Sequence, residues 1–462
     1  MRQNELMPAD ERRNRDISRD ANRDVNRDAS RVSNPALQLR PPLRIHGGLL
    51  IITFVMICFG LVTLFSASMS DSFSDTSGDS MYYIIKQGSI TLIGLVLALI
   101  LAVSIPVSFF DRPIITITTY ILTTGLLVYV KFFGSIVNGA KRWILLGPLS
   151  IQPSEFAKLA AVLCLAGYFS RLRARRQRKE IRYKSAFHRF IGDGWRDILI
   201  PGALMAVWLG LIIWQPHVSG FVILSVVILA SFMAAGLPLR SWISGILQFL
   251  LILVVIVAIA LGAFSATLKD QTITEALQQN FSHAFKRIDT FKNPDTANSD
   301  DAYQVNQSLM AIGSGGLTGV GLGEGRQKYN YLPEAHNDYI FAIIGEELGF
   351  VGTVSVVLLF LVFLLIGIRI AWRAINPHAA VIAAGYTVLI TTQALLNIGV
   401  ATRALPATGI SLPFFSYGGT SNLFFLLAIG FILAVSRTGQ MPNAKMRNLM
   451  GEIEALSRGE QP

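Results

Sequence analysis

The residues with the clearest capacity for chemistry lie at 331–349, where ionisable side chains run directly into a long apolar stretch. Asp338 stands at the boundary, His336 precedes it, and Glu346 and Glu347 follow inside the apolar stretch. A carboxylate within a membrane span costs roughly 2.5–3.5 kcal/mol or more, so such residues usually have a function. Asp338 is therefore the first candidate for a catalytic acid or base. The structural alternative is a helix N-cap, because Asp is favoured at a helix start.

Helical spacing separates Asp338 from the two glutamates. Eight or nine residues correspond to about 12–14 Å along a helix axis, which is too far for two carboxylates to act on one bond. We expect Asp338 to act alone, and Glu346 and Glu347 to make polar contacts between helices. The six histidines show no ligand spacing, so no zinc site is predicted.

A second group of polar residues lies upstream. Lys141 and Arg142 are adjacent cations, and Trp143 has the amphipathic ring typical of a membrane interface. A Pro-Ser pair before Glu155 indicates a helix start, and Lys158 follows at the same-face spacing of an ion pair. This pattern predicts either a cationic site for an anionic lipid headgroup or an interfacial anchor with a structural Glu155–Lys158 pair.

Two further segments have irregular composition. The glycine-rich stretch 311–325 matches neither a P-loop nor a dinucleotide fingerprint, so it predicts closely packed backbone. Segment 397–421 contains two prolines and four glycines between two apolar runs, and it offers the hydroxyls of Ser416 and Tyr417. Broken backbone at membrane depth is tolerated where it lines a cavity or is buried in protein.

The elements that must position these residues are membrane helices. The chain has 462 residues, is 52% hydrophobic and has a mean hydropathy of +0.50, which excludes an ordinary soluble protein. The sequence predicts an all-α polytopic membrane protein with about ten spans. The predicted spans are 48–68, 84–108, 113–132, 154–170, 198–214, 218–236, 240–264, 338–372, 379–400 and 422–436.

Charge predicts the topology. The net charge of +11 is concentrated in the N-terminal tail, in the loop 171–196 and in the C-terminal tail. Basic loops favour the cytoplasm, so both tails, 1–47 and 437–462, are predicted to be cytoplasmic, and the first of them to be disordered. The long connection 265–337 between spans 7 and 8 is then extracytoplasmic. The basic residues indicate topology and not a nucleic-acid site.

Four motifs in order resemble one family, the SEDS proteins of bacterial cell-wall synthesis. They lie at 138–143, 152–158, 332–349 and 412–419 within a membrane domain of about 48–436. Ala335 and Gly345 resemble the division branch of the family more than the elongation branch.

The resemblance implies a peptidoglycan glycosyltransferase of the bacterial inner membrane that acts at the division septum. It would polymerise lipid II onto a nascent glycan strand, and the aspartate at the position of Asp338 is taken to be essential in the family. Lys141, Arg142, Lys158 and a possible divalent cation, Mg²⁺ or Mn²⁺, would stabilise the leaving pyrophosphate.

The remaining candidates for the substrate site are Trp143, Glu155, His336, Ser416 and Tyr417. The implied partners are a class B penicillin-binding protein (an FtsI-like transpeptidase) and divisome activators. The rival hypothesis is a lipid II flippase, since broken helices and buried charges also suit transport. A scaffold that only recruits division proteins is a third hypothesis.

Three residues depart from the pattern of the family. Asn337 replaces the usual Thr beside Asp338, and Arg403 stands where relatives commonly have Gly. His217 occupies a position where many relatives have Asp, so no carboxylate role is expected there.

Overall fold

The computed structural model describes residues 45–76, 78–137, 140–146, 149–267 and 300–438. Predictions about the two tails, 1–44 and 439–462, and about 268–299 in the long connection lie outside the described residues.

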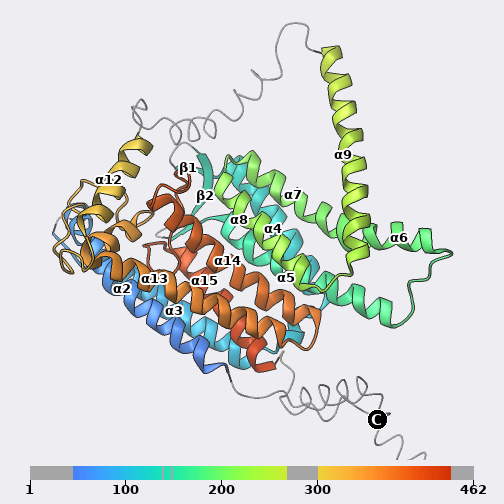
Figure 1. The fold of residues 1–462 in the computed structure, drawn as a ribbon, viewed down its shortest axis with the longest axis horizontal. Coiled ribbons are helices and arrows are strands. Elements are labelled where there is room, and N and C mark those ends of the chain that lie inside the picture. The colour runs from blue at the N-terminus through green and yellow to red at the C-terminus, as the bar shows by residue number, and fades with distance from the viewer. Residues whose placement is uncertain (1–44, 77, 138–139, 147–148, 268–299, 439–462) are drawn as a thin grey trace, which may run out of the picture. The chain divides into compact units, whose positions relative to one another are not determined.

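Each of the ten predicted apolar runs coincides with a helix (Figure 1). These helices are α2 Gly47–Asp75, α3 Tyr82–Ser104, α4 Pro113–Phe133, α5 Pro153–Gln177, α7 Ile200–Trp214, α8 Val218–Ala234, α9 Leu239–Thr267, α13 Ile340–Trp372, α14 Pro377–Ala401 and α15 Thr420–Thr438. Shorter helices connect them: η2 Val107–Asp111, α6 Ala186–Gly194, η3 Trp195–Leu199 and α12 Asp300–Ser314. Among the described helices, seven segments are long and apolar enough to cross a membrane, the α6–η3–α7 stretch counting as one. The prediction of a polytopic helical membrane protein is confirmed.

A small antiparallel sheet, which the all-α prediction missed, joins α4 to α5. Its strands are β1 Ser135–Val137, β2 Ala140–Leu146 and β3 Leu149–Ile151, in the order β1-β2-β3. Asn138-Gly139 and Gly147-Pro148, which connect them, are strong turn signals in the sequence. The strands are too short to register as apolar periodicity, which explains why they were not predicted; the predominantly helical fold class is confirmed.

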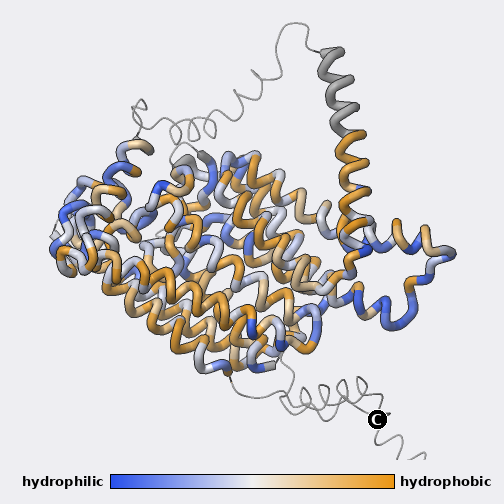
Figure 2. Tube along the Cα trace, in the orientation of Figure 1, coloured by the Kyte–Doolittle hydropathy of each residue, from blue (hydrophilic) through white to orange (hydrophobic). Residues whose placement is uncertain are grey.

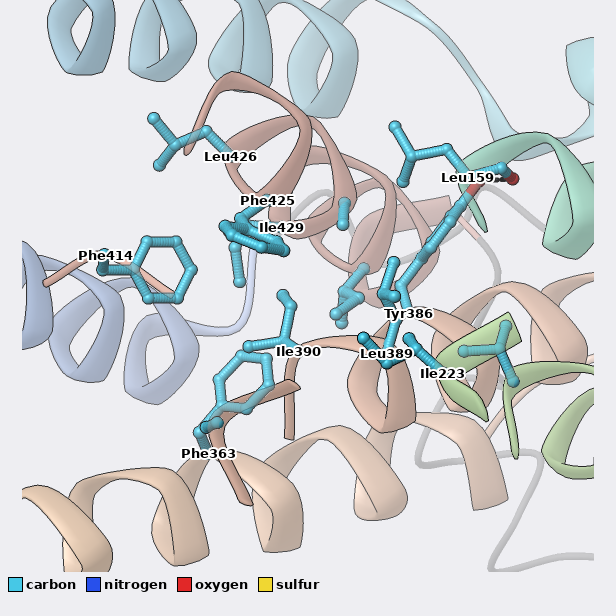
Figure 3. Close-up of a cluster of buried hydrophobic side chains, with 14 of the residues drawn as sticks. Leu159, Ile223, Phe363, Tyr386, Leu389, Ile390, Phe414, Phe425, Leu426 and Ile429 are labelled. Carbon is cyan, nitrogen blue, oxygen red and sulfur yellow. Dashed lines mark hydrogen bonds between the residues drawn. The ribbon is translucent and has the colours of Figure 1, made fainter. Parts of the chain in front are cut away.

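Helix α14 lies in the interior of the membrane domain. It contacts α5, α8, α13 and α15, and 67% of its apolar window is buried, against 22–44% in α2, α3, α4 and α13. Its Tyr386 is fully buried and donates a hydrogen bond to the Leu159 carbonyl of α5 over 3.0 Å (Figure 3). The outer helices instead carry apolar residues along their length (Figure 2), and many of these are exposed. Polar residues on α14 are therefore placed in the protein interior.

Helix α13 is broken at Gly349, whose φ of 64° lies in the left-handed region. The glycine-rich stretch packs against this break: a Cβ on Gly315 would lie 1.9 Å from the Gly345 carbonyl oxygen. A Cβ on Gly319 would lie 2.1 Å from the Glu347 carbonyl oxygen. Only glycine permits this approach of two backbones, so the prediction of closely packed backbone is confirmed.

Candidate active site

Asp338 lies in a non-helical turn before α13. The helix begins at Ile340 with Tyr339 as its N-cap residue, so the N-cap alternative for Asp338 is wrong. Glu334 shapes the turn with a φ of 58°, and its carbonyl accepts hydrogen bonds from Asn337 N at 3.0 Å and Tyr339 N at 3.4 Å. Asp338 is half-buried.

The connection between α14 and α15, residues 402–419 (the α14–α15 loop), lies against Asp338. The Asn397 amide of α14 donates to the Asp338 carbonyl at 2.8 Å and to the Ile410 carbonyl at 2.7 Å. Gly409, with a φ of +63°, approaches the carboxylate so closely that a Cβ there would lie 3.3 Å from Asp338 Oδ2. Asn397 therefore fixes both the acidic turn and the loop beside it.

The α14–α15 loop enters the protein interior, as predicted for broken backbone at membrane depth. Phe414 and Phe415 are buried, and a Cβ on Gly60 of α2 would lie 2.2 Å from the Phe414 carbonyl oxygen. The predicted site residue Ser416 is also buried, and its Oγ accepts a hydrogen bond from Leu412 N at 2.7 Å. Ser416 thus stabilises the loop from within.

Glu155 and Lys158 form the predicted ion pair, with 2.7 Å between Oε1 and Nζ. Both are buried, at 6% and 1% exposure, so Lys158 is not an open cation. Lys158 also donates to Gln393 Oε1 of α14 at 2.8 Å, and Gln393 Nε2 lies 3.4 Å from the Ser411 carbonyl of the α14–α15 loop.

The ion pair and Asp338 are connected through α14. Gln393 and Asn397 are four residues apart, which places them on one face of the helix, about 6 Å apart along its axis. Gln393 bonds Lys158, and Asn397 bonds the Asp338 backbone. The Glu155–Lys158 pair and the acidic turn are therefore held by successive turns of one helix.

His336 belongs to a cluster at the ends of α2 and α3. Its Nδ1 lies 2.7 Å from Asp71 Oδ2, and its ring stacks on Tyr83 with 4.9 Å between centroids. Tyr417 N donates to the His336 carbonyl at 2.9 Å, and Lys86 lies over the Tyr417 ring at 5.8 Å from the centroid. The cluster joins two predicted site residues, His336 and Tyr417.

Lys141, Arg142 and Trp143 lie on β2, which contacts α4 and α5. The pairing of β1 with β2 is irregular here, because Ser135 pairs with Trp143 and Ile136 pairs with Lys141. Arg142 is therefore the extra residue on β2, and the alternation of side chains is interrupted between the two cations. Lys141 is exposed, whereas Arg142 and Trp143 are half-buried. The sheet is anchored to the bundle by Thr420, which donates to the Ser150 carbonyl at 2.7 Å.

Glu347 makes the predicted polar contact between helices, whereas Glu346 bonds the non-helical segment before α13. Glu346 Oε1 accepts a hydrogen bond from Arg326 N at 2.8 Å. Glu347 accepts from Ser66 of α2 and from Lys328, each at 2.7 Å. Both glutamates are buried, so neither is placed to meet a substrate.

A metal site built from protein ligands alone does not fit. Within the described ranges, no three His, Cys, Asp or Glu side chains gather closely enough to hold an ion. A Mg²⁺ ion prefers oxygen ligands and commonly takes several of them from phosphates and water.

Gln393 and Asn397 were missed from the sequence, although a signal existed. Both are amides within an otherwise apolar run, four residues apart. Buried polar residues in a membrane span are rarely there without a role. Asp71, Tyr83 and Lys86 carried no comparable signal, because they lie near the ends of their spans.

Comparison with known proteins identifies the family of the chain. The model of the cell cycle protein family that groups FtsW, RodA and SpoVE matches residues 48–441. The chain belongs to this family.

Two curated relatives illustrate the similarity. A probable peptidoglycan glycosyltransferase FtsW of Synechocystis is 35% identical over 83% of this chain and 87% of its own. Stage V sporulation protein E of Bacillus subtilis is 34% identical over 84% of this chain and 96% of its own.

Solved structures share the fold. One comes from work on the structural coordination of polymerization and crosslinking by a peptidoglycan synthase complex. It has a TM-score of 0.61 at 24% identity and covers 87% of this chain and 100% of that chain. The rod shape determining protein RodA of Thermus thermophilus has a TM-score of 0.56 at 24% identity, covering 87% of this chain and 99% of that chain. The resemblance to the SEDS family is confirmed.

Proposed function

We propose that this chain is a peptidoglycan glycosyltransferase that polymerises lipid II, with Asp338 as the general base. Family membership and the names of its relatives support the activity class. The observation that carries the assignment of the base is the position of Asp338. It is a half-buried carboxylate in a turn held by Asn397 and covered by Gly409, whereas Glu346 and Glu347 are buried in structural bonds.

Asp338 removes the proton from the acceptor sugar hydroxyl, which must come within hydrogen-bond reach. The hydroxyl oxygen then forms a bond to the anomeric carbon of the donor strand, and the bond from that carbon to the lipid pyrophosphate breaks. A single displacement inverts the anomeric centre. The deep burial of Glu346 and Glu347 argues against either as a nucleophile for a double displacement.

The leaving pyrophosphate requires positive charge. Lys141 is exposed on β2, which makes it the candidate most accessible to the pyrophosphate. The charge of Lys158 is balanced by Glu155, so we assign that pair to positioning Gln393 and the α14–α15 loop. Trp143 holds the sugar or the isoprenoid stem, while His336 and Tyr417 shape the entrance beside Asp338. A divalent cation would be held mainly by the pyrophosphate oxygens and would balance their charge.

The same proposal places the chain in the bacterial inner membrane at the division septum, with both termini cytoplasmic. Its partners are a class B penicillin-binding protein and divisome activators. A structural neighbour from a study of a peptidoglycan synthase complex supports this partner class.

Polymerisation of lipid II by the purified chain in liposomes, with and without the penicillin-binding protein, tests this function. We expect glycan polymer when lipid II is supplied on the outer side alone. Parallel reactions contain Mg²⁺, Mn²⁺ or a chelator, which tests the need for a divalent cation. Movement of lipid II between leaflets without polymer would establish the rival flippase. If the chain shows neither polymerisation nor lipid movement, the scaffold hypothesis remains.

A further inference from the structure

A cavity of about 430 Å³ lies where the basic loop 171–196 meets the helices, far along α5 from Glu155. Four arginines line it, together with Tyr168, Glu180 and apolar residues. The four are Arg171, Arg175, Arg182 and Arg196.

The charge of this cavity is strongly unbalanced. Glu180 is the only carboxylate among its described lining residues, and it pairs with Arg175 at 3.3 Å. Asp111 partly balances the charge of Arg171, which also donates to the Asp111 carbonyl at 3.4 Å. Asp193 and Asp197 bond Arg176 at 2.9 and 2.8 Å. None of these three aspartates lines the cavity. An anion bearing several oxygens would balance the excess of positive charge.

Arg196 gives a second indication. Its Nη1 is buried, and no hydrogen-bond partner for it occurs in the part of the chain that the structure describes. Buried donors are nearly always satisfied, and guanidinium groups bind phosphate oxygens with several donors at once. Arg196 therefore keeps unused donor capacity beside the cavity, and its guanidinium also lies over the Tyr183 ring, with 5.6 Å from Cζ to the ring centroid.

An apolar groove of about 240 Å³ adjoins the cavity and shares Tyr168 and Arg171 with it. The groove lies between α4, α5 and α7, and it includes Ile117, Ile121 and Leu204, which are 54%, 65% and 39% exposed. A groove that opens on the apolar outer surface of a membrane domain suits a hydrocarbon chain.

We infer that the arginine cavity and the adjoining groove form a binding site for an anionic phospholipid. The phosphate lies among the arginines, and one acyl chain lies in the groove between α4 and α7. Loop 171–196 is predicted to face the cytoplasm, so the lipid comes from the cytoplasmic leaflet. This site is separate from the proposed catalytic one and does not depend on the proposed function.

Lipid exchange measured by native mass spectrometry on the full chain in detergent tests this site. The probes are phosphatidylglycerol and phosphatidylcholine with identical acyl chains. The test variant is Arg175→Gln/Arg182→Gln, and the matched control is Arg173→Gln/Arg178→Gln, which changes the same charge on exposed residues outside the cavity. Each arginine near an anionic lipid contributes about 5-fold in affinity, so the test variant should lose roughly 25-fold in preference for phosphatidylglycerol.

The control pair should keep the preference of the wild type. Equal binding of the two lipids by the wild type, or an equal loss in the control variant, would overturn the inference. Ile117→Trp fills the apolar groove and separates a lipid from free phosphate. Phosphatidylglycerol binding should weaken in this variant. If Ile117→Trp binds the lipid as the wild type does, and inorganic phosphate displaces that lipid, the ligand is a free phosphate and the proposal of a lipid site is wrong. Monodisperse elution and an unchanged melting temperature verify that each variant is folded.

Discussion

Substitutions of the buried pair Glu155–Lys158 can separate its effect on the stability of the fold from its effect on activity. The two side chains are 6% and 1% exposed, so Glu155→Gln leaves a lysine charge in the interior without its counter-ion. Breaking a buried pair in this way costs about 3–5 kcal/mol of unfolding free energy.

The double variant Glu155→Leu/Lys158→Met removes both charges and keeps the volume similar. Such replacements are often neutral or stabilising by about 1–4 kcal/mol. Here the gain is offset by about 1–3 kcal/mol, because the Gln393 oxygen loses the bond that Lys158 donates at 2.8 Å. We expect the double variant to be nearly as stable as the wild type and clearly more stable than Glu155→Gln.

The assay combines thermal unfolding in detergent, followed by tryptophan fluorescence, with polymerisation of lipid II. If the pair positions Gln393 against Ser411 of the α14–α15 loop, the stable double variant should polymerise poorly. If Glu155→Gln has the melting temperature of the wild type, the argument that an unpaired buried lysine destabilises the fold is wrong. A double variant that is both stable and fully active would show that the pair serves the fold alone.

Three further predictions concern the backbone and pH. Arg403 has a φ of 56° just after α14, so Arg403→Gly should raise stability by up to about 1 kcal/mol in the same unfolding assay. Gly60→Ala should lower both the melting temperature and the activity, because its Cβ would lie 2.2 Å from the Phe414 carbonyl oxygen, whereas Gly125→Ala, with nothing within 4 Å, should not. Burial, followed by the charge of Arg369, lowers the pKa of His46 from 6.5, so the fold favours its neutral form. Its contribution to stability should fall as the pH drops below about 6.5, and His46→Asn should flatten that part of the pH profile of the melting temperature.

The sequence predicted the helices because apolar length is a strong local signal. It also predicted the start of α5 and the Glu155–Lys158 pair, since both depend on residues a few positions apart. The β-sheet was missed because its strands are short, although Asn138-Gly139 marks a hairpin. The start of α13 was placed too early, because hydrophobicity begins before the backbone becomes helical at Ile340.

The contacts that assemble the site join residues far apart in the chain. Asn397 reaches the Asp338 backbone across 59 positions, and His336 reaches Asp71 across 265. Neither pairing follows from spacing or composition, since each depends on which helices become neighbours. The role of Lys158 changed for the same reason: its charge was visible in the sequence, whereas its burial was not.

The turnover of Asp338→Asn in lipid II polymerisation, with the partner transpeptidase present, tests the central claim most directly. A positioned general base contributes about 10²–10⁴-fold, so kcat should fall by that factor while binding of lipid II is retained. Glu324→Gln, which neutralises an exposed carboxylate in the glycine-rich stretch, serves as the matched control and should behave as the wild type. Asp338→Asn with the kcat of the wild type would contradict the account.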